Sequence, residues 1–190
     1  MKIENIENIE EKSLLLKVKN KDRQAFINAY DLYVDQLYRF IYFKVGNSED
    51  AKDLTSAVFL RTWTYLLENK IINEKTLKAL LYKIARNLII DHYRKTNQHN
   101  NISLDNGISD KNLIDEKQDL IKQSENTFDL IMVETKLLEL KDEYREAIVL
   151  HFINELSIKE MAEILDKPEG NIRVLIHRAL KAIRQLTINN

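Results

Sequence analysis

The sequence contains no cysteine, a single proline and three glycines among its 190 residues. The lack of cysteine excludes disulfides and thiolate chemistry, and it is typical of a protein of the reducing cytoplasm. Proline and glycine punctuate strand-rich folds, so their scarcity favours helices almost throughout. We therefore expect an all-α fold.

Long apolar runs are missing as well. No segment approaches the roughly 18 apolar residues of a membrane span, and residues 1–20 lack the apolar centre of a signal peptide. The four histidines are scattered without ligand spacing, so we expect no metal and no other cofactor. Paired histidines and carboxylates, glycine-rich phosphate loops and nucleophile elbows are also missing, which argues against an enzyme. These absences predict a cytoplasmic protein without membrane insertion or catalytic activity.

The charge is nearly balanced, with a formal net charge of −1. Residues 1–95 hold 17 Lys and Arg against 13 Asp and Glu, whereas residues 127–190 hold 9 against 11. A chain with so few surplus cations would release few counterions on DNA, so its affinity for DNA by itself should be low. If it binds DNA, another protein is expected to hold it there.

The pattern of residues 157–184 predicts two short amphipathic helices joined by a tight turn. Ser157 and Glu160 have the spacing of a capping box, and Pro168 with Glu169 suits the start of the second helix. The first helix should bury Ile158, Met161, Ala162 and Leu165. This pattern is typical of a helix-turn-helix, whose second helix enters the major groove of DNA.

The second of these helices has one apolar and one polar face at 100° per residue. The apolar face consists of Ile172, Leu175, Ile176, Ala179, Leu180 and Ile183. The opposite face and its flank carry Asn171, Arg173, Val174, His177, Arg178 and Lys181. Their donors could contact DNA, but an αα-hairpin with a solvated cationic face is the alternative.

The N-terminal half predicts three helices. The first begins at Asp22 as N-cap and ends at Gly46, the second is capped by Asn47 or Ser48 and runs to about residue 67, and the third runs over residues 76–95. One edge of the third helix is cationic and consists of Lys83, Arg86, Asn87, Ile90 and Arg94. This edge is a second candidate nucleic-acid surface, and a solvated face is again the alternative.

Residues 96–126 are rich in Asn, Ser and Asp, contain Gly107 and show no sustained period. They are expected to form a flexible acidic linker. Residues 134–152 resume a helical pattern, with an interruption near Lys141 and Asp142. We therefore expect two small helical domains, residues 1–95 and residues 127–190, with the helix-turn-helix in the second.

Three ordered blocks, residues 25–63, 81–95 and 140–179, resemble the extracytoplasmic-function (ECF) sigma factors of the sigma-70 family. The resemblance implies that residues 1–95 bind the coiled-coil clamp of core RNA polymerase and open the minus-ten promoter element. It implies that residues 127–190 read the minus-thirty-five element, and that an anti-sigma factor is a further candidate partner. Polymerase would then hold the chain beside promoter DNA, which explains how a weakly basic chain can function there.

The resemblance also implies roles for individual residues. The polymerase-binding positions are Asp53, Leu54, Phe59, Leu60, Arg61 and Trp63. The minus-ten positions are Asn69, Lys70, Ile71, Tyr82, Lys83, Arg86, Asn87, Ile90 and Arg94, with Tyr82, Lys83 and Arg86 on or near the exposed edge. The minus-thirty-five positions are Asn171, Arg173, Val174, His177, Arg178 and Lys181. Phe59 and Trp63 could equally be core residues, because large aromatic side chains are mostly buried.

The chain departs from the family pattern at two places. Lys52, Ser56 and Ala57 replace polar residues of the polymerase-binding stretch, and Val174 with Leu175 replaces a Ser-Arg pair in the DNA-reading helix. These changes concern the clamp contacts and the promoter bases that are read, and they leave the expected fold unchanged.

Two other functions fit the pattern less well. A dimeric helix-turn-helix regulator that binds an operator would leave residues 25–95 unexplained. A helical adaptor without DNA contact would not account for two separate cationic helix faces. The sequence therefore favours a sigma factor that directs promoter recognition, DNA melting and transcription initiation.

Overall fold

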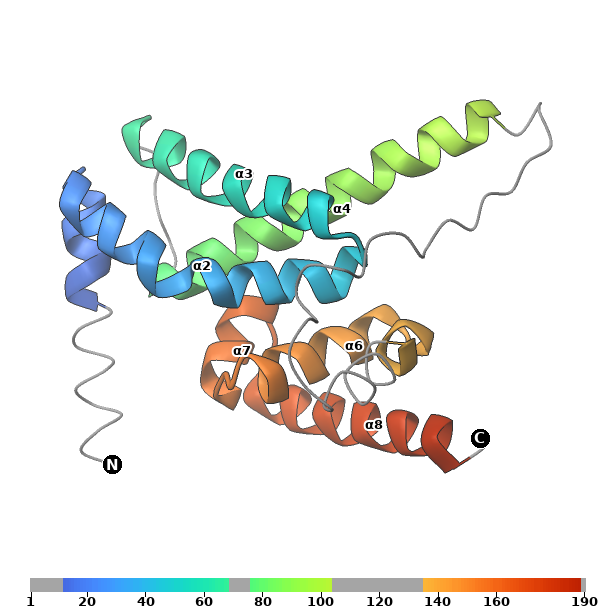
Figure 1. The fold of residues 1–190 in the computed structure, drawn as a ribbon. Helices are drawn as coiled ribbons and strands as arrows, with labels where there is room; N and C mark the ends of the chain where they lie inside the picture. The colour runs from blue at the N-terminus through green and yellow to red at the C-terminus, as the bar shows by residue number, and fades with distance from the viewer. Residues whose placement is uncertain (1–11, 69–75, 104–134, 189–190) are drawn as a thin grey trace, which may run out of the picture.

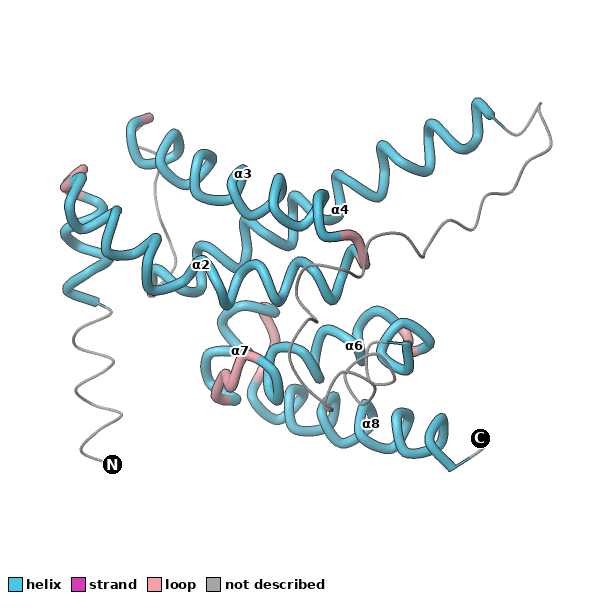
Figure 2. Tube along the Cα trace, in the orientation of Figure 1, coloured by secondary structure: helices cyan, strands magenta, loops and turns pink. Residues whose placement is uncertain are grey.

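The structure of the chain, a computed structural model, describes residues 12–68, 76–103 and 135–188. Every regular element within these residues is a helix, which confirms the all-α expectation (Figure 2). A helix over residues 12–19 precedes α2 (Arg23–Val45), α3 (Ser48–Leu67) and α4 (Leu77–Ser103). A short helix over residues 135–139 precedes α6 (Asp142–Ile148), the π-helical turn η1 (Val149–Ile153), α7 (Ile158–Leu165) and α8 (Glu169–Ile188).

The first two long helices begin and end at the residues that the sequence predicts. The Asp22 carboxylate accepts hydrogen bonds from the backbone N–H groups of Gln24 and Ala25, at 2.9 and 3.1 Å. Gly46 ends α2 in the left-handed conformation, with φ of 75°. Asn47, rather than Ser48, caps α3 through two backbone N–H groups. These local bonds satisfy amides that have no partner inside a helix.

The N-terminal domain, which comprises residues 12–68 and α4, has a core formed by the inward faces of its helices. Tyr33, Leu37, Phe40 and Ile41 of α2 are buried, as are Ala51 and Val58 of α3 and Leu77, Leu81, Ala85 and Ile89 of α4. Leu67, at the end of α3, is exposed.

Helix α4 is longer than the sequence predicts. It continues through Ser103, whereas the expected linker began at residue 96. No glycine or proline stands between Leu77 and Asn106, and the hydroxyl of Thr96 donates to the carbonyl of His92 within the helix. The polar residues that suggested a linker are therefore compatible with further helical turns, and the remaining linker residues lie outside the described ranges.

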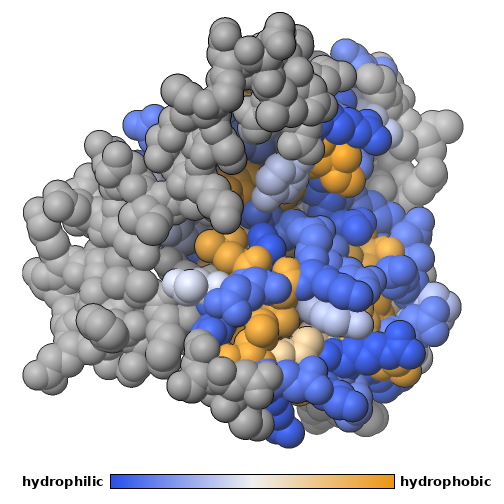
Figure 3. Space-filling model, turned by 90° about the vertical axis from the view of Figure 1, so that its right-hand side faces the viewer, coloured by the Kyte–Doolittle hydropathy of each residue, from blue (hydrophilic) through white to orange (hydrophobic). Residues whose placement is uncertain are grey.

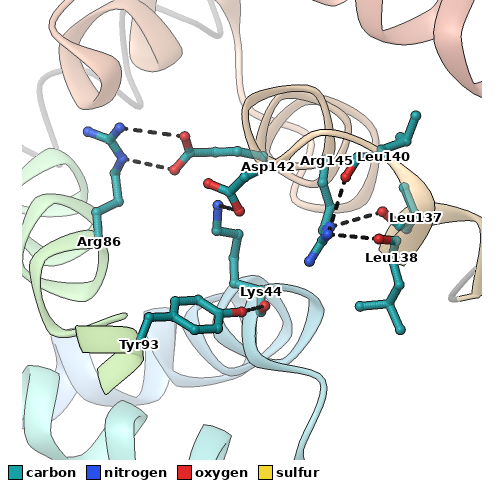
Figure 4. A network of polar contacts seen from close by, with 9 residues as sticks. Lys44, Arg86, Tyr93, Leu137, Leu138, Leu140, Asp142 and Arg145 are labelled. Atoms are coloured by element: carbon teal, nitrogen blue, oxygen red, sulfur yellow. Dashed lines mark hydrogen bonds and ion pairs between the residues drawn. The ribbon is translucent and has the colours of Figure 1, made fainter. Parts of the chain in front are cut away.

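The expected interruption near Lys141 is present, and a single side chain bridges it. The guanidinium of Arg145 in α6 donates to the carbonyls of Leu137, Leu138 and Leu140, at 2.9, 3.0 and 3.2 Å (Figure 4). These carbonyls lie at the C-terminal end of the short helix over residues 135–139, where helix carbonyls lack partners within the helix. The Leu137 carbonyl also accepts a backbone hydrogen bond from the N–H of Leu140. A cation at a helix C-terminus also interacts favourably with the helix dipole.

The helix-turn-helix forms as expected. Ser157 and Glu160 make a capping box at the start of α7, and Asp166 ends α7 in the left-handed conformation, with φ of 56°. Helix α8 begins at Glu169, one residue after the expected start at Pro168. The turn then places α7 against α8, so that α8 belongs to the C-terminal domain, which comprises residues 135–188.

The two domains pack directly against each other. Helices α2 and α4 contact α6, η1 and α7, while α8 lies on the far side of the C-terminal domain (Figure 1). The polar contacts across this interface join residues between 60 and 118 positions apart in the chain. The periodicity of a sequence indicates which residues share a face of one helix, but not which distant helix that face contacts. It therefore did not predict this interface.

Candidate nucleic-acid interface

The outward face of α8 is a row of exposed side chains. All six residues predicted for the minus-thirty-five element are exposed, namely Asn171, Arg173, Val174, His177, Arg178 and Lys181. The opposite side is held in place because Ile172, Ile176 and Ala179 are buried in the C-terminal core. The helix therefore presents cations, an amide and an imidazole outward from a fixed support, which is the arrangement a major-groove reader needs.

Two of these side chains differ from simple solvated donors. Val174 is 48% exposed among polar neighbours, and an exposed aliphatic group in this position can contact a thymine methyl. Arg173 forms an ion pair with Glu169 one turn earlier, at 3.0 Å. Exposed pairs of this spacing contribute only about 0.3–0.5 kcal/mol, so Arg173 can exchange Glu169 for a phosphate at little cost.

The cationic edge of α4 is divided between solvent and the C-terminal domain. Asn87, Ile90 and Arg94 are exposed, with the Arg94 side chain 75% accessible and 3.8 Å from Asp91. Lys83 is half-buried. The open part of α4 thus retains an amide, an aliphatic group and a cation.

Tyr82 and Arg86 correct the prediction for the same helix. Tyr82 was expected on or near the exposed edge but is fully buried, with an exposed fraction of 0%. Arg86 forms an ion pair with Glu146 of α6, at 2.8 Å from Nε to Oε1, and also donates to the Ile164 carbonyl at 3.4 Å. Both side chains face the C-terminal domain, because positions 82 and 86 are one turn apart on one side of α4.

Further polar contacts cross the interface near Arg86. The ammonium of Lys44, a residue that is almost fully buried, pairs with Asp142 at the start of α6 (Figure 4). Within the N-terminal domain, the Tyr93 hydroxyl of α4 donates to the Lys44 carbonyl of α2. Lys78 at the start of α4 pairs with Glu160 of α7, at 2.6 Å. Nothing in the sequence marked Lys44, Lys78, Asp142 or Glu160 as partners across a domain boundary.

The Asn154 side chain reaches across the interface to α2 and α4. Its amide nitrogen donates to the Gln36 carbonyl at 2.9 Å and to the Tyr82 hydroxyl at 2.7 Å. Burial raises the pKa of Tyr82, and the hydrogen bond from Asn154 only partly opposes this effect. Tyr82 therefore remains a neutral hydroxyl that can accept from Asn154 at physiological pH.

Two other groups near the interface titrate away from their ordinary range. Burial raises the pKa of Tyr93. Burial alone would also raise the pKa of Glu160, but the hydrogen bond and the charge of Lys78 outweigh it, so that the pKa of Glu160 lies below its usual value. Glu160 is therefore a carboxylate at neutral pH, and it serves both the capping box and the pair with Lys78.

The polymerase-binding positions on α3 fall into two groups. Asp53, Leu60 and Arg61 are exposed, and Leu60 is 69% accessible although it is apolar. Phe59 is buried against Phe26 and Tyr30, and Trp63 is half-buried against Phe26. Phe59 is thus buried in the core, whereas Trp63 is only partly buried.

Leu54, a further predicted contact, is half-buried on α3. The loop positions predicted for the minus-ten element, Asn69, Lys70 and Ile71, lie outside the described residues.

Neither a membrane span nor a metal site is found in the described part of the chain. None of its helices combines the length and the apolar composition of a membrane span. No group of three or more His, Asp or Glu side chains there is arranged to hold a metal ion.

On the face shown in Figure 3, apolar patches lie between hydrophilic side chains.

Comparison with known proteins identifies two family models that together cover most of the described residues. The family model for sigma-70 region 2 matches residues 29–99, which include α3 and most of α4. The model for sigma-70, region 4 matches residues 130–183, which include the helix-turn-helix.

Curated relatives match over most of the chain. The ECF RNA polymerase sigma factor SigW of Bacillus subtilis is 32% identical over 184 residues, which cover 92% of this chain and 95% of SigW. The ECF RNA polymerase sigma factor BldN of Streptomyces coelicolor is 30% identical, over 87% of this chain and 61% of BldN.

Two solved structures share the fold. CnrH, in complex with the cytosolic domain of CnrY, has a TM-score of 0.69 at 19% identity and covers 95% of this chain, which itself covers 98% of CnrH. The sigma factor RpoE of Bartonella quintana, in complex with the anti-sigma factor NepR, has a TM-score of 0.65 at 22% identity, with 85% of this chain and 96% of RpoE covered. From both family models and from the extent of the match with SigW, the chain belongs to the sigma-70 family as an ECF RNA polymerase sigma factor, a class of transcription initiation factors.

Proposed function

We propose that the chain directs core RNA polymerase to promoters through three surfaces, one on each of α3, α4 and α8. The observation that carries this proposal is the pair of exposed polar faces on α4 and α8, each on a helix whose other side is fixed in a core. The two faces belong to different domains, so they can contact two separate stretches of one promoter. We assign the minus-ten function to residues 1–95, the linker to residues 96–126 and the minus-thirty-five function to residues 127–190.

The α8 face reads the minus-thirty-five element in the major groove. Asn171 and Arg178 are exposed and carry donors of the kind that contact base edges, Val174 offers an aliphatic contact, and Lys181 suits a phosphate. A bidentate base contact contributes about 1–3 kcal/mol of discrimination, whereas a phosphate contact adds affinity without specificity.

The α4 face acts at the minus-ten element. DNA opening requires no covalent chemistry, because unpaired bases only have to be held outside the stack against a cost of a few kcal/mol per step. Asn87 and Arg94 provide hydrogen bonds for this purpose, and Ile90 provides an apolar contact between them. The loop residues Asn69, Lys70 and Ile71 are proposed to hold the unpaired bases.

Helix α3 provides the polymerase-binding surface. Leu60 is the most exposed of the large apolar residues in the described ranges, and Asp53 and Arg61 place opposite charges on the same helix. An apolar contact with a charged rim is the usual composition of a protein interface. Phe59 and Trp63 support this surface from beneath rather than from its centre.

The remaining assignments follow from this function. The chain works in the cytoplasm, where polymerase and promoters are, and it needs neither a cofactor nor catalytic residues of its own. An anti-sigma factor is proposed as a further partner, because a sigma factor of the same fold was solved with the anti-sigma factor NepR.

Transcription in vitro tests the proposal. Purified core enzyme is incubated with bacterial genomic DNA in the presence and absence of the chain, and the start sites are mapped. We expect start sites that appear only with the chain and share two sequence elements upstream. An unchanged set of start sites would contradict the proposed function.

Two exposed arginines separate the α4 and α8 assignments and act as controls for each other. Arg94→Ala should impair strand opening while promoter binding persists, and Arg178→Ala should weaken binding to the upstream element. Arg86→Ala is unsuitable as a first test, because it also removes the pair with Glu146. If both variants opened the mapped promoters like the unmodified chain, neither face would be the DNA-binding surface.

A further inference from the structure

The first turn of α8 contains a glycine that the packing of the described chain does not require. A Cβ atom added at Gly170 would meet nothing within 4 Å. The backbone of Gly170 is helical and is not in the left-handed conformation, so an alanine fits there without strain. Glycine also destabilises a helix relative to alanine. The space that Gly170 leaves is therefore open to a molecule outside the chain.

Gly170 lies at the end of α8 that comes closest to DNA in a helix-turn-helix. The N-terminal residues of a recognition helix contact the base edges, and Gly170, Asn171 and Arg173 are all exposed. A glycine backbone approaches a ligand more closely than any residue with a side chain. The first turn of α8 is thus shaped for a close approach to the floor of the major groove.

The same turn carries an exposed pair of opposite charges. Glu169 and Arg173 are four positions apart on one side of α8, with Arg173 Nη2 at 3.0 Å from Glu169 Oε2. The Arg173 side chain is 59% exposed and the Glu169 side chain 49%. Within the described residues, the two side chains bond only with each other. Most donors of the guanidinium and most acceptor sites of the carboxylate therefore remain available.

The pair is complementary to the major-groove edge of a G·C base pair. This edge presents two acceptors, N7 and O6 of guanine, followed by one donor, the N4 amino group of cytosine. Arg173 offers two parallel donors for the guanine, and Glu169 offers an acceptor beside them for the cytosine. An A·T pair has a donor in place of the second acceptor and an acceptor in place of the donor, so it faces both side chains with groups that repel them.

We propose that Glu169 and Arg173 together read one G·C base pair of the minus-thirty-five element, and that Gly170 lets α8 come close enough for this contact. The inference rests on the function proposed for α8, and it adds a carboxylate as a specificity-determining residue. Glu169 repels phosphates, so it weakens binding to DNA in general, and only the amino group of a cytosine offsets this repulsion. On other sequences Arg173 leaves Glu169 for a phosphate.

Core RNA polymerase assembled with the full chain tests the role of Glu169. Each base pair of the upstream element of a mapped promoter is varied in turn, and the four pairs are compared in competition binding. One position should prefer G·C in a single orientation. Glu169→Gln should reduce this preference at least about fivefold and leave the preferences at the other positions unchanged. The same variant should bind duplex DNA of random sequence about twofold tighter, because Arg173 is then free for phosphates.

Glu139→Gln is the matched control. Glu139 is exposed, lies outside the helix-turn-helix and pairs with Lys136 at 3.3 Å. The control therefore removes the same charge from an exposed pair of the same domain, and it should leave every preference unchanged. Equal preferences of the Glu169 and Glu139 variants at every position would overturn the proposal.

Gly170→Ala tests the close approach with two readouts of opposite sign. Alanine favours the helix, so the midpoint of urea unfolding should rise. The added methyl group lies between α8 and the bases, so the affinity of polymerase with this variant for the promoter should fall at least about fivefold. Gln185→Ala, at an exposed position near the other end of α8, should leave this affinity unchanged. An unchanged promoter affinity of Gly170→Ala, or a lower midpoint, would overturn the role of Gly170.

Arg178 distinguishes failure of this proposal from failure of the function proposed for α8. If Arg178→Ala and Glu169→Gln both leave the preferences at all upstream positions unchanged, α8 does not read the element and both proposals fail. If Arg178→Ala weakens the preference at one position and Glu169→Gln weakens none, only the assignment of Glu169 and Arg173 is overturned.

Discussion

The hydrogen bond between Asn154 and Tyr82 allows a quantitative test of the domain interface. Both side chains are buried and lie 72 positions apart in the chain, and the amide nitrogen is 2.7 Å from the hydroxyl oxygen. Tyr82→Phe removes the acceptor and keeps the ring in the core. Asn154→Ala removes this bond and the second one to the Gln36 carbonyl.

The expected magnitudes follow from counting bonds. Each buried hydrogen bond contributes about 1 kcal/mol to the free energy of unfolding, so Tyr82→Phe should cost about 1 kcal/mol and Asn154→Ala about 2 kcal/mol. The alanine variant also leaves the Tyr82 hydroxyl buried without its donor. Combining both substitutions removes that stranded hydroxyl, so the double variant should lose about 1 kcal/mol less than the sum of the single variants.

Urea unfolding followed by circular dichroism measures all four chains. The linear extrapolation gives the unfolding free energy of each, and the coupling energy is the difference between the double variant and the sum. Additive losses would show that Asn154 and Tyr82 do not contact each other in solution. The domains would then not be packed as the structure shows.

Three further outcomes are expected. Ser157→Ala removes the N-cap of α7 and should lower the unfolding free energy by about 1 kcal/mol in the same urea assay; an unchanged midpoint would refute the capping role. Glu160→Gln keeps a capping side chain but loses the charge pair with Lys78. The pKa of Glu160 is lowered in the folded chain, so the carboxylate stabilises the fold fully above its ordinary pKa of 4.5. This stabilisation is lost as the pH falls through the lowered pKa. The stability difference between this variant and the unmodified chain should therefore shrink on acidification below pH 4.5, and a constant difference would contradict the assignment. Leu60→Asp should weaken binding to core polymerase at least about tenfold in a pull-down titration, and Thr64→Asp at an exposed position serves as the control. Equal binding of the two variants would exclude Leu60 from the interface.

Local features of the fold follow closely from the sequence. Asp22, Asn47 and Ser157 cap helices, and Gly46 ends α2 in the left-handed conformation. Each of these features depends on a few neighbouring residues, which is why spacing alone predicts them. The exposed row on α8 follows in the same way from the period of one helix.

The features that the sequence did not predict depend on distant segments. Tyr82 was expected on or near the exposed edge of α4, among the minus-ten positions that the family resemblance implies. It is buried because Asn154, far away in the chain, supplies a polar partner for its hydroxyl. Arg86 likewise pairs with Glu146, a residue whose own neighbours along the chain carry no sign of this contact.

Hydroxyl-radical footprinting on a mapped promoter tests the central claim most directly. With core polymerase and the chain together, we predict two separate protected stretches upstream of the start site. Arg178→Ala should weaken only the distal stretch and Arg94→Ala only the proximal one. Protection of a single palindromic stretch by the chain alone, unchanged by polymerase, would identify a conventional regulator and contradict the account.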